Sequence, residues 1–331
     1  MAVSSTLAAT IVGCGSVDCA TLATCPESSS KPAEDSIFDG GRADAYQNPT
    51  ADGPHCQGMG RACGGDDCCA SDVVPGGTFR RSYDGVLNGG YADANFVATV
   101  DDFRLDRYEV TIGRFRAFLA GYGSPINGTG KNPNDPTDPG WQASSNALLP
   151  SASKLASLLS CERQRWTEAP GSDETKPVAC LTWYEAFAFC IWDGGRLPTE
   201  AEWNYAAAGG SEQRAFPWSS PPYSLVIDDS HAVHGPEMLA VAPVGSKPNG
   251  HGKWGHADLA GNVSEWTRDL WARPYVTPCE NCSEQAANSP ARVLRGGAAG
   301  DAAEFLRTGR RDYASPEARR STFGVRCARK V

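Results

Sequence analysis

A segment near residue 115 places apolar side chains at helical spacing. From Phe115 to Tyr122 they recur every three or four residues, which is the pattern of one buried helix face. Thr111 precedes this run and can cap the first turn, while Gly123 follows it and favours termination. The pattern predicts an amphipathic helix between these two residues.

Two further helices are predicted by capping boxes. Thr182 and Thr199 are each followed three residues later by glutamate, Glu185 and Glu202. In this arrangement the threonine hydroxyl accepts the amide of the third helical residue, and the glutamate accepts the amide of the threonine. Each box precedes an apolar run that ends at a Gly-Gly pair, so we expect two short helices joined by a brief link.

The C-terminal third of the chain carries only brief strand-like pieces. Residues 292–294 and 323–326 are two such pieces, set among Gly, Pro and Asn. The whole chain has 36 Gly and 23 Pro in 331 residues, a high share that favours loops. We therefore expect an α+β fold with low regular secondary structure.

The sequence of the N-terminal region predicts an export signal followed by a linker. Residues 1–13 end in an apolar stretch before Cys14, which looks like the lipobox of a bacterial lipoprotein, although neither Lys nor Arg precedes it. The alternative is an ordinary disordered tail. Residues 14–54 are small and polar, so they form a disordered linker. Cys14 is the expected lipidation site.

A cysteine-rich cap is expected over residues 55–73. Cys56, Cys63, Cys68 and Cys69 fall there, and their spacing favours disulfides over a zinc site because the adjacent pair lacks the usual C-x2-C spacing. Thirteen cysteines in the chain favour an oxidising compartment. We expect an exported protein of the bacterial cell envelope or a secreted one, with its main domain over residues 74–331.

Charge and hydropathy exclude two kinds of partner. The net charge is −9, with no basic block, so nucleic acid is not expected to bind. No apolar run approaches the roughly 20 residues that span a bilayer. We expect membrane attachment only through a lipid anchor.

Four motifs carry a family resemblance. They are GGRLPTEAEWNYAAAGG (194–210), DLAGNVSEW (258–266), VLRGG (293–297) and FGVRCAR (323–329), preceded by VPGGTF (74–79) and FRLDRYEVTIGRF (103–115). In this order they resemble the formylglycine-generating enzyme family, also called the sulfatase-modifying factor family. The resemblance implies a C-type lectin-like fold.

The resemblance also implies a copper site that this chain lacks. Enzymes that make formylglycine use two cysteines after an RGGS strand, and soft thiolates suit Cu(I). Here these two positions fall on Asp301 and Leu306, and the chain has no cysteine between Cys282 and Cys327. We expect no copper and no formylglycine-generating activity. The function expected is a non-catalytic binding or structural module.

The alternative is a metal-dependent oxidoreductase of the same family that uses other ligands. Besides His55, the chain has His231, His234, His251 and His256, which flank the AGNVSEW motif and give spacings compatible with an imidazole site. The simpler interpretation is that they are solvated loop residues.

Disulfides are expected within the main domain. The resemblance implies a bond between Cys190 and Cys327, and we also expect Cys161 to pair with Cys180. The Cys279-x2-Cys282 pair favours a local loop staple over a redox motif or half a zinc site, because neither context surrounds it.

The ligand of a binding module is not named by the sequence. Nine tryptophans favour core and rim packing, although Trp254, Trp266 and Trp271 could line a groove for a carbohydrate or peptide. An unknown peptide or carbohydrate is therefore the expected partner.

A structural calcium site is the last expectation. In the family, the stretch matched by residues 261–266 supplies oxygen ligands to Ca²⁺, and Asn262 and Glu265 keep that hard-donor chemistry. In the alternative, Asn262 shapes a tight turn and Glu265 forms a salt bridge.

Overall fold

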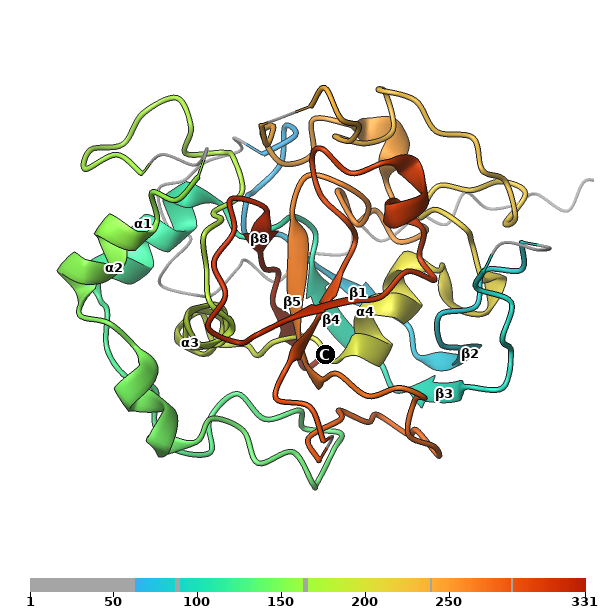
Figure 1. Ribbon diagram of the computed structural model, residues 1–331, viewed down its shortest axis with the longest axis horizontal. Coiled ribbons are helices and arrows are strands. Elements are labelled where there is room, and N and C mark those ends of the chain that lie inside the picture. Colours follow the sequence, from blue (N-terminus) through green and yellow to red (C-terminus); the bar gives the residue numbers. More distant parts are fainter. Residues whose placement is uncertain (1–62, 87–89, 163–165, 239, 287) are drawn as a thin grey trace, which may run out of the picture. The chain divides into compact units, whose positions relative to one another are not determined.

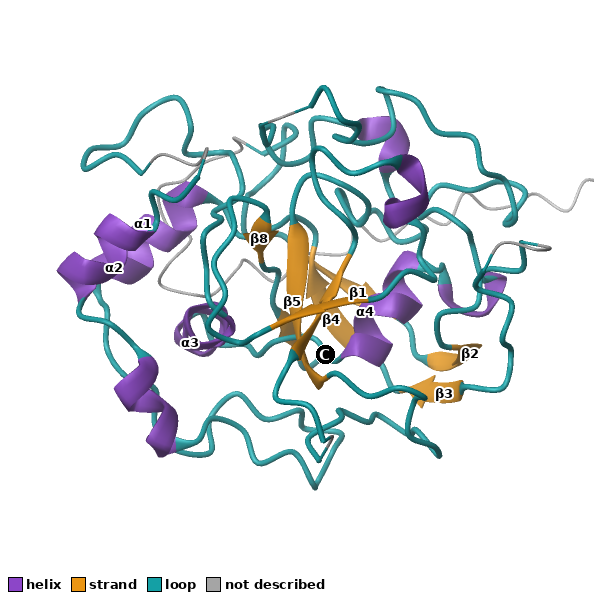
Figure 2. Cartoon of the chain, in the orientation of Figure 1, coloured by secondary structure: helices purple, strands orange, loops and turns teal. Residues whose placement is uncertain are grey.

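The computed structural model describes residues 63–86, 90–162, 166–238, 240–286 and 288–331, all within one compact unit. The expected signal segment, Cys14, the linker to residue 54 and Cys56 lie outside the described residues. Irregular backbone makes up most of the described residues, as Figure 2 shows, and confirms the low regular secondary structure expected from the Gly and Pro content.

Short helices and strands are separated by these irregular segments. The α-helices are α1 (Ile112–Ala120), α2 (Ala152–Leu158), α3 (Trp183–Trp192) and α4 (Glu200–Ala207). The strands are β1 (Ser71–Val74), β2 (Gly77–Arg80), β3 (Val97–Val100), β4 (Phe103–Asp106), β5 (Ser264–Leu270), β6 (Arg292–Arg295), β7 (Asp312–Ala314), β8 (Phe323–Gly324) and β9 (Ala328–Arg329). Single 3₁₀ turns occur at Ala143–Leu148, Gly210–Glu212, Pro248–Gly250 and Ala303–Leu306.

Three small sheets organise the strands. One has the order β7-β6-β5-β8, with β5 antiparallel to β6 and parallel to β8. A second has the antiparallel order β1-β4-β9, and β2 pairs with β3 alone. In Figure 1, β5 and β4 stand at the centre, with α1 and α2 on one side and α4 with β2 and β3 on the other. The C-terminal strands thus pair with both early and late segments.

The helix caps confirm the sequence pattern. Both predicted capping boxes are present, with Thr182 and Thr199 accepting the amides of Glu185 and Glu202. The hydroxyl of Thr111 caps α1, although α1 ends at Ala120 rather than running to Gly123. The earlier end reflects Gly121, whose amide closes the last turn.

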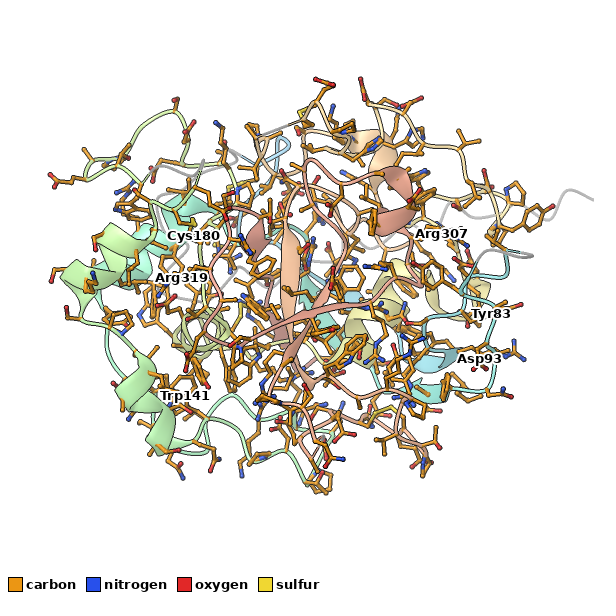
Figure 3. All side chains as sticks on the ribbon, in the orientation of Figure 1. Tyr83, Asp93, Trp141, Cys180, Arg307 and Arg319 are labelled. Carbon is orange, nitrogen blue, oxygen red and sulfur yellow. A yellow bond between two sulfur atoms is a disulfide. The ribbon has the colours of Figure 1, made fainter. Side chains whose placement is uncertain are left out.

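Disulfides fix the loops to this frame. Cys190 in α3 pairs with Cys327, and Cys161 pairs with Cys180, as expected. The local staple between Cys279 and Cys282 is present as well. Figure 3 marks Cys180, whose carbonyl accepts a hydrogen bond from Arg319.

The cysteine-rich cap is a disulfide segment where it is described. Cys63 pairs with Cys68, and Cys69 is also disulfide-bonded, so these thiols are not zinc ligands. The first strand, β1, begins at Ser71 within the expected cap and pairs along its whole length with β4. None of the helices in the described ranges is long and apolar enough to cross a bilayer.

Candidate functional site

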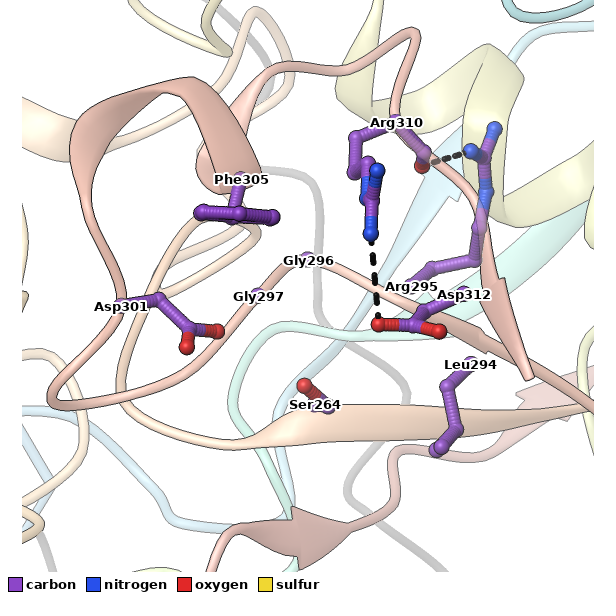
Figure 4. A pocket seen from close by; sticks show the side chains of 9 residues that line it. All are labelled: Ser264, Leu294, Arg295, Gly296, Gly297, Asp301, Phe305, Arg310 and Asp312. Atoms are coloured by element: carbon purple, nitrogen blue, oxygen red, sulfur yellow. Dashed lines mark hydrogen bonds and ion pairs between the residues drawn. The ribbon is translucent and has the colours of Figure 1, made fainter. Parts of the chain in front are cut away.

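A small hollow lies at the end of the RGG strand. β6 ends at Arg295, the glycines Gly296 and Gly297 turn the chain, and Ser264 at the start of β5 faces the same space (Figure 4). Both glycines have positive φ, which L-residues adopt only with strain. The turn therefore brings residues 298–312 back over the sheet, and the hollow between them is shallow.

Asp301 and Leu306, the residues expected at the two copper-cysteine positions, have structural roles. The carboxylate of Asp301 accepts the amide of Ala298 at 2.9 Å and so closes the turn after the glycines. Partial burial raises the pKa of this carboxyl. Leu306 is fully buried and packs with Phe216 and Ala260. Because a leucine in the core offers no donor atom, these two positions do not form a metal site.

The rest of the hollow is polar and charged. The guanidinium of Arg310 stands 4.8 Å from the ring centre of Phe305, and its Nη2 lies 3.6 Å from Asp312. The main-chain carbonyl of Arg310 also accepts a bond from Arg295 (Figure 4). Phe305 is 38% exposed, so an apolar ring and an ion pair are presented together. Such a surface can hold a ligand that has both apolar and charged groups.

A second candidate site is a buried cluster of carboxylates behind the AGNVSEW motif. Glu109, Asp258 and Glu265 are buried around the single guanidinium of Arg326. Burial, followed by repulsion from Asp258 and Glu265, raises the pKa of Glu109 well above its usual range. Burial raises the pKa of Asp258 to about 6. The cluster thus holds three carboxyl groups beside one guanidinium, and a divalent cation would favour the charged form of the two whose pKa is raised.

Both expected calcium ligands, Asn262 and Glu265, lie in this cluster, but their side chains already bond to other residues of the protein. The Asn262 amide donates to Glu109 at 2.6 Å, and its oxygen accepts the amide of Ala242 at 3.0 Å. Both oxygens of Glu265 accept bonds from Arg326, and one also accepts Trp203. Asn262 has a φ of 59°. This matches the alternative given by the sequence, in which Asn262 shapes a tight turn and Glu265 forms a salt bridge.

The histidines do not gather into a metal site in the described part of the chain. His231 bonds Asp228 at 2.9 Å and stacks on Trp218. His256 has no exposed surface and bonds the carbonyl of Leu105 at 3.2 Å, so the interpretation of it as a solvated loop residue is wrong. Burial lowers the pKa of His256 to about 4, which keeps the ring neutral.

Among the described residues, the one group of three potential ligands that converge is Asp106, Asp193 and Cys327. It contains none of the histidines. The two carboxylates pair with Arg114 and Arg329, and Cys327 is in a disulfide, so this group is structural.

The three tryptophans considered for a groove lie in different environments. Trp266 is fully buried in the main core, and Trp254 stacks on Tyr205. Trp271 packs on the exposed Tyr313, with ring centres 4.5 Å apart. They do not line one groove, because β5 directs Trp266 inward.

Comparison with known proteins decides the family. The profile of the sulfatase-modifying factor enzyme 1-like domain matches residues 66–331, which is most of the chain. The chain belongs to the formylglycine-generating enzyme family. A formylglycine-generating enzyme of Streptomyces coelicolor is 30% identical over 253 residues, covering 68% of this chain and 77% of that protein.

Other relatives and structures extend this picture. A hercynine oxygenase of Mycolicibacterium thermoresistibile is 32% identical over 242 residues, which cover 70% of this chain. The match spans about half, 52%, of that relative. The solved structure of PvdO from Pseudomonas aeruginosa has a TM-score of 0.56 at 24% identity, covering 79% of this chain and 94% of that chain. The family thus includes oxidoreductases, and the C-type lectin-like fold expected from the motifs is confirmed.

Sequence reasoning missed two acids of the buried cluster. Glu109 and Asp258 both lie inside quoted motifs, yet neither was singled out. The signal available was an acidic residue flanked by apolar residues, as in the Tyr108-Glu109-Val110 triplet, where burial of the neighbours implies burial of the acid. Their convergence needed the tertiary structure, because 149 residues separate them in a chain with few regular elements.

Proposed function

We propose that this protein is a non-catalytic binding module built on the formylglycine-generating enzyme scaffold. The proposal rests on the roles of the two residues expected at the copper-cysteine positions, Asp301 and Leu306. Asp301 closes a turn and Leu306 fills a core, so both positions serve the fold. A carboxylate and a leucine cannot supply the linear thiolate pair on which Cu(I) chemistry depends.

An assay on a sulfatase-type Cys-x-Pro-x-Arg peptide tests this proposal. The purified protein, with and without added copper, should give no formylglycine above a no-enzyme control. The Streptomyces coelicolor enzyme under the same conditions serves as the positive control. Product formed by this chain in amounts that scale with its concentration would refute the non-catalytic role.

The ligand proposed is a peptide or carbohydrate that binds at the hollow of Figure 4. Support comes from Phe305, Arg310 and Asp312, which present a ring and an ion pair at its rim. A peptide or glycan array would first identify a ligand of the wild-type protein. Arg310→Ala should then weaken the affinity for that ligand at least tenfold. Arg320→Ala, which removes an exposed guanidinium elsewhere, should leave it unchanged.

Export and lipid anchoring through Cys14 complete the proposal. The linker to residue 54 would then hold the domain away from a membrane surface, as a polar spacer does. In a bacterial host, the wild type should incorporate labelled palmitate and fractionate with membranes, whereas Cys14→Ser should do neither. A wild-type chain that is neither labelled nor processed would refute lipid anchoring through Cys14.

We also propose that the buried carboxylate cluster binds a structural calcium ion. The two carboxyl groups of Glu109 and Asp258 support this, because burial disfavours their charged form, as their raised pKa values show, and a cation would favour it. These two carboxylates would hold the ion beside Asn262, while Glu265 keeps its bond to Arg326. Calcium would supply the missing positive charge and rigidify the loop around residues 258–263.

A further inference from the structure

The loop that carries Cys279 and Cys282 is held in place by hydrogen bonds that do not involve its disulfide. The amide of Thr99 in β3 donates to the carbonyl of Cys279 at 2.9 Å, and the amide of Asn281 donates to the carbonyl of Thr99 at 2.8 Å. The side chain of Asn281 accepts the amide of Asp101 at 2.7 Å and donates to the Asp101 carboxylate at 2.9 Å. These bonds fix the loop against β3 between the two cysteines.

The disulfide itself closes a very short loop. Its two cysteines are separated by 3 positions, whereas Cys190 and Cys327 are separated by 137. On the chain-entropy account, the short loop restricts the unfolded chain less, so opening it weakens the fold less. Together with the hydrogen bonds to β3, this allows the Cys279–Cys282 bond to open and close in the folded protein.

The two cysteines of this pair differ in their access to solvent. Cys279 is 3% exposed and packs in the core beside Val100, whereas Cys282 is half-buried and lines a cavity with Val276 and Ser283. Thiol–disulfide exchange requires that an attacking thiolate reach one of the two sulfurs. Cys282 is therefore the residue open to attack. The Cys190–Cys327 bond offers no such approach, because neither of its residues has exposed surface.

A guanidinium group lies against the sulfur of Cys282. Nη1 of Arg81 is 3.7 Å from this sulfur, and Nη2 donates to the carbonyl of Val276 at 2.8 Å, which fixes the position of the group. A neighbouring cation favours the thiolate form of a cysteine, and a sulfur that is stabilised as a thiolate leaves a disulfide faster.

The carboxylates of the same cavity act against a thiolate by repulsion, but they are bonded to other groups. Glu200 accepts two bonds from Arg311, and the oxygens of Asp269 accept main-chain amides. The carboxylate of Glu284 accepts the amide of Ala286. Arg81, in contrast, contacts the sulfur itself.

We propose that Cys279 and Cys282 are a redox-active pair that exchanges its disulfide with a dithiol, and that Cys282 is the residue attacked. A thiolate of the dithiol bonds to the sulfur of Cys282, the Cys279–Cys282 bond breaks, and Cys279 leaves as a thiolate. The second thiolate of the dithiol then attacks the sulfur of its own molecule in this mixed disulfide, and Cys282 leaves as a thiolate beside Arg81.

Electrons and protons balance in this exchange. The dithiol loses two electrons and two protons and becomes a disulfide, while the protein pair gains the two electrons. Cys279 takes up one proton, and the other passes to Cys282 or to solvent. Two neighbouring thiols of a peptide or protein are the substrate class. The exchange is separate from ligand binding at the hollow of Figure 4, because the two sites share no lining residue.

The first test follows the disulfides of the full-length wild type during timed exposure to dithiothreitol, a small dithiol. Released thiols are alkylated and located by peptide mapping. Cys279 and Cys282 should become alkylated at least tenfold faster than Cys190 and Cys327, while near-UV circular dichroism keeps its native form. Reduction of the pair no faster than that of Cys190–Cys327, or loss of the native spectrum when only the pair is reduced, would overturn the proposal without any variant.

The second test assigns the roles of the two sulfurs and of Arg81. The free thiol of Cys282 in Cys279→Ser should react with oxidised glutathione at least tenfold faster than that of Cys279 in Cys282→Ser. Release of glutathione from Cys282 by dithiothreitol should then slow about fivefold or more when Arg81→Met is added to Cys279→Ser. Arg81→Lys, which keeps a cation, should restore most of the rate.

Arg80→Met removes the exposed arginine next to Arg81 and is the control, so it should leave the release rate unchanged. Equal reactivity of the two single thiols would show that Cys282 is not the preferred sulfur. A release rate that is the same with and without Arg81→Met would show that the guanidinium does not assist the exchange. Either result would refute the proposed roles.

Discussion

Arg326 and Glu265 form a bidentate ion pair with N–O distances of 2.7 Å, and neither side chain has exposed surface. The pair joins the FGVRCAR and DLAGNVSEW motifs through two residues that are 61 positions apart. Arg326 also donates to the carbonyl of Ala257, so it satisfies main-chain groups as well as a charge. The pair therefore holds the C-terminal segment against β5.

Breaking this pair from one side should be strongly destabilising. Arg326→Met leaves Glu265 buried without its counter-charge, so the free energy of unfolding should fall by about 3 to 5 kcal/mol. Urea titration followed by tryptophan fluorescence measures it. The matched control is Arg320→Met, whose pair with Glu162 is exposed, and it should change stability by about 1 kcal/mol or less. Equal effects of the two substitutions would contradict the structural role.

The Cys190–Cys327 disulfide should contribute more stability than the Cys279–Cys282 staple. The two bonds span separations of 137 and 3 residues. On the chain-entropy account, the larger loop contributes about 5 kcal/mol and the smaller about 2 kcal/mol. Paired Cys→Ala variants of each bond, compared by urea unfolding, should reproduce this order.

Peptide mapping without reduction provides the check on the pairing. It should recover Cys190 linked to Cys327. Free thiols at these positions, or other partners for them, would show that the expected bond does not form in solution.

Stability should fall as the pH rises through 7, in part because of Asp269. Burial, followed by repulsion from Glu200, raises the pKa of Asp269 to about 7 from its ordinary value of 3.8. Between these two values the folded state binds a proton that the unfolded state does not, so lowering the pH stabilises the fold. The contribution is complete below about pH 4 and is lost as the pH rises through 7.

The Asp269→Asn variant should remove this part of the dependence. Urea unfolding at pH 5 and pH 8 should show a smaller difference in unfolding free energy for the variant than for the wild type, by a few kcal/mol. Asp312→Asn, at an exposed carboxylate, is the control and should keep the wild-type difference. The same pH difference in wild type and Asp269→Asn would rule out this carboxyl as the source.

Calcium should raise the melting temperature through the buried carboxylates. At one hundred times the dissociation constant, binding adds about 2.7 kcal/mol, which is a rise of several degrees for a domain of this size. The comparison is a thermal melt in EDTA and in millimolar Ca²⁺, for wild type and for Asp258→Asn. The variant should lose the response.

The exposed Asp312→Asn variant should respond to calcium as the wild type does. Identical melting temperatures of the wild type in the two buffers would refute the calcium proposal. A full response from Asp258→Asn would show that this carboxylate is not a ligand.

Local sequence determined the helix starts and the family. The hydroxyls of Thr182 and Thr199 cap α3 and α4 because the partner glutamate lies three residues away, so the whole interaction is contained in one turn. The motifs likewise identify the family and its fold, since each motif is a contiguous segment. The absence of cysteine between Cys282 and Cys327 is also a property of the sequence alone.

Only the tertiary structure decided which charged groups meet. Glu109, Asp258 and Glu265 lie buried near Arg326, and among the described residues Arg81 is buried without an ion pair, because strands and loops distant in sequence pack together. No periodicity encodes such meetings in a chain built mainly of irregular loops. Burial removes the water that would otherwise screen these charges, so their shifted pKa values arise only in the folded state.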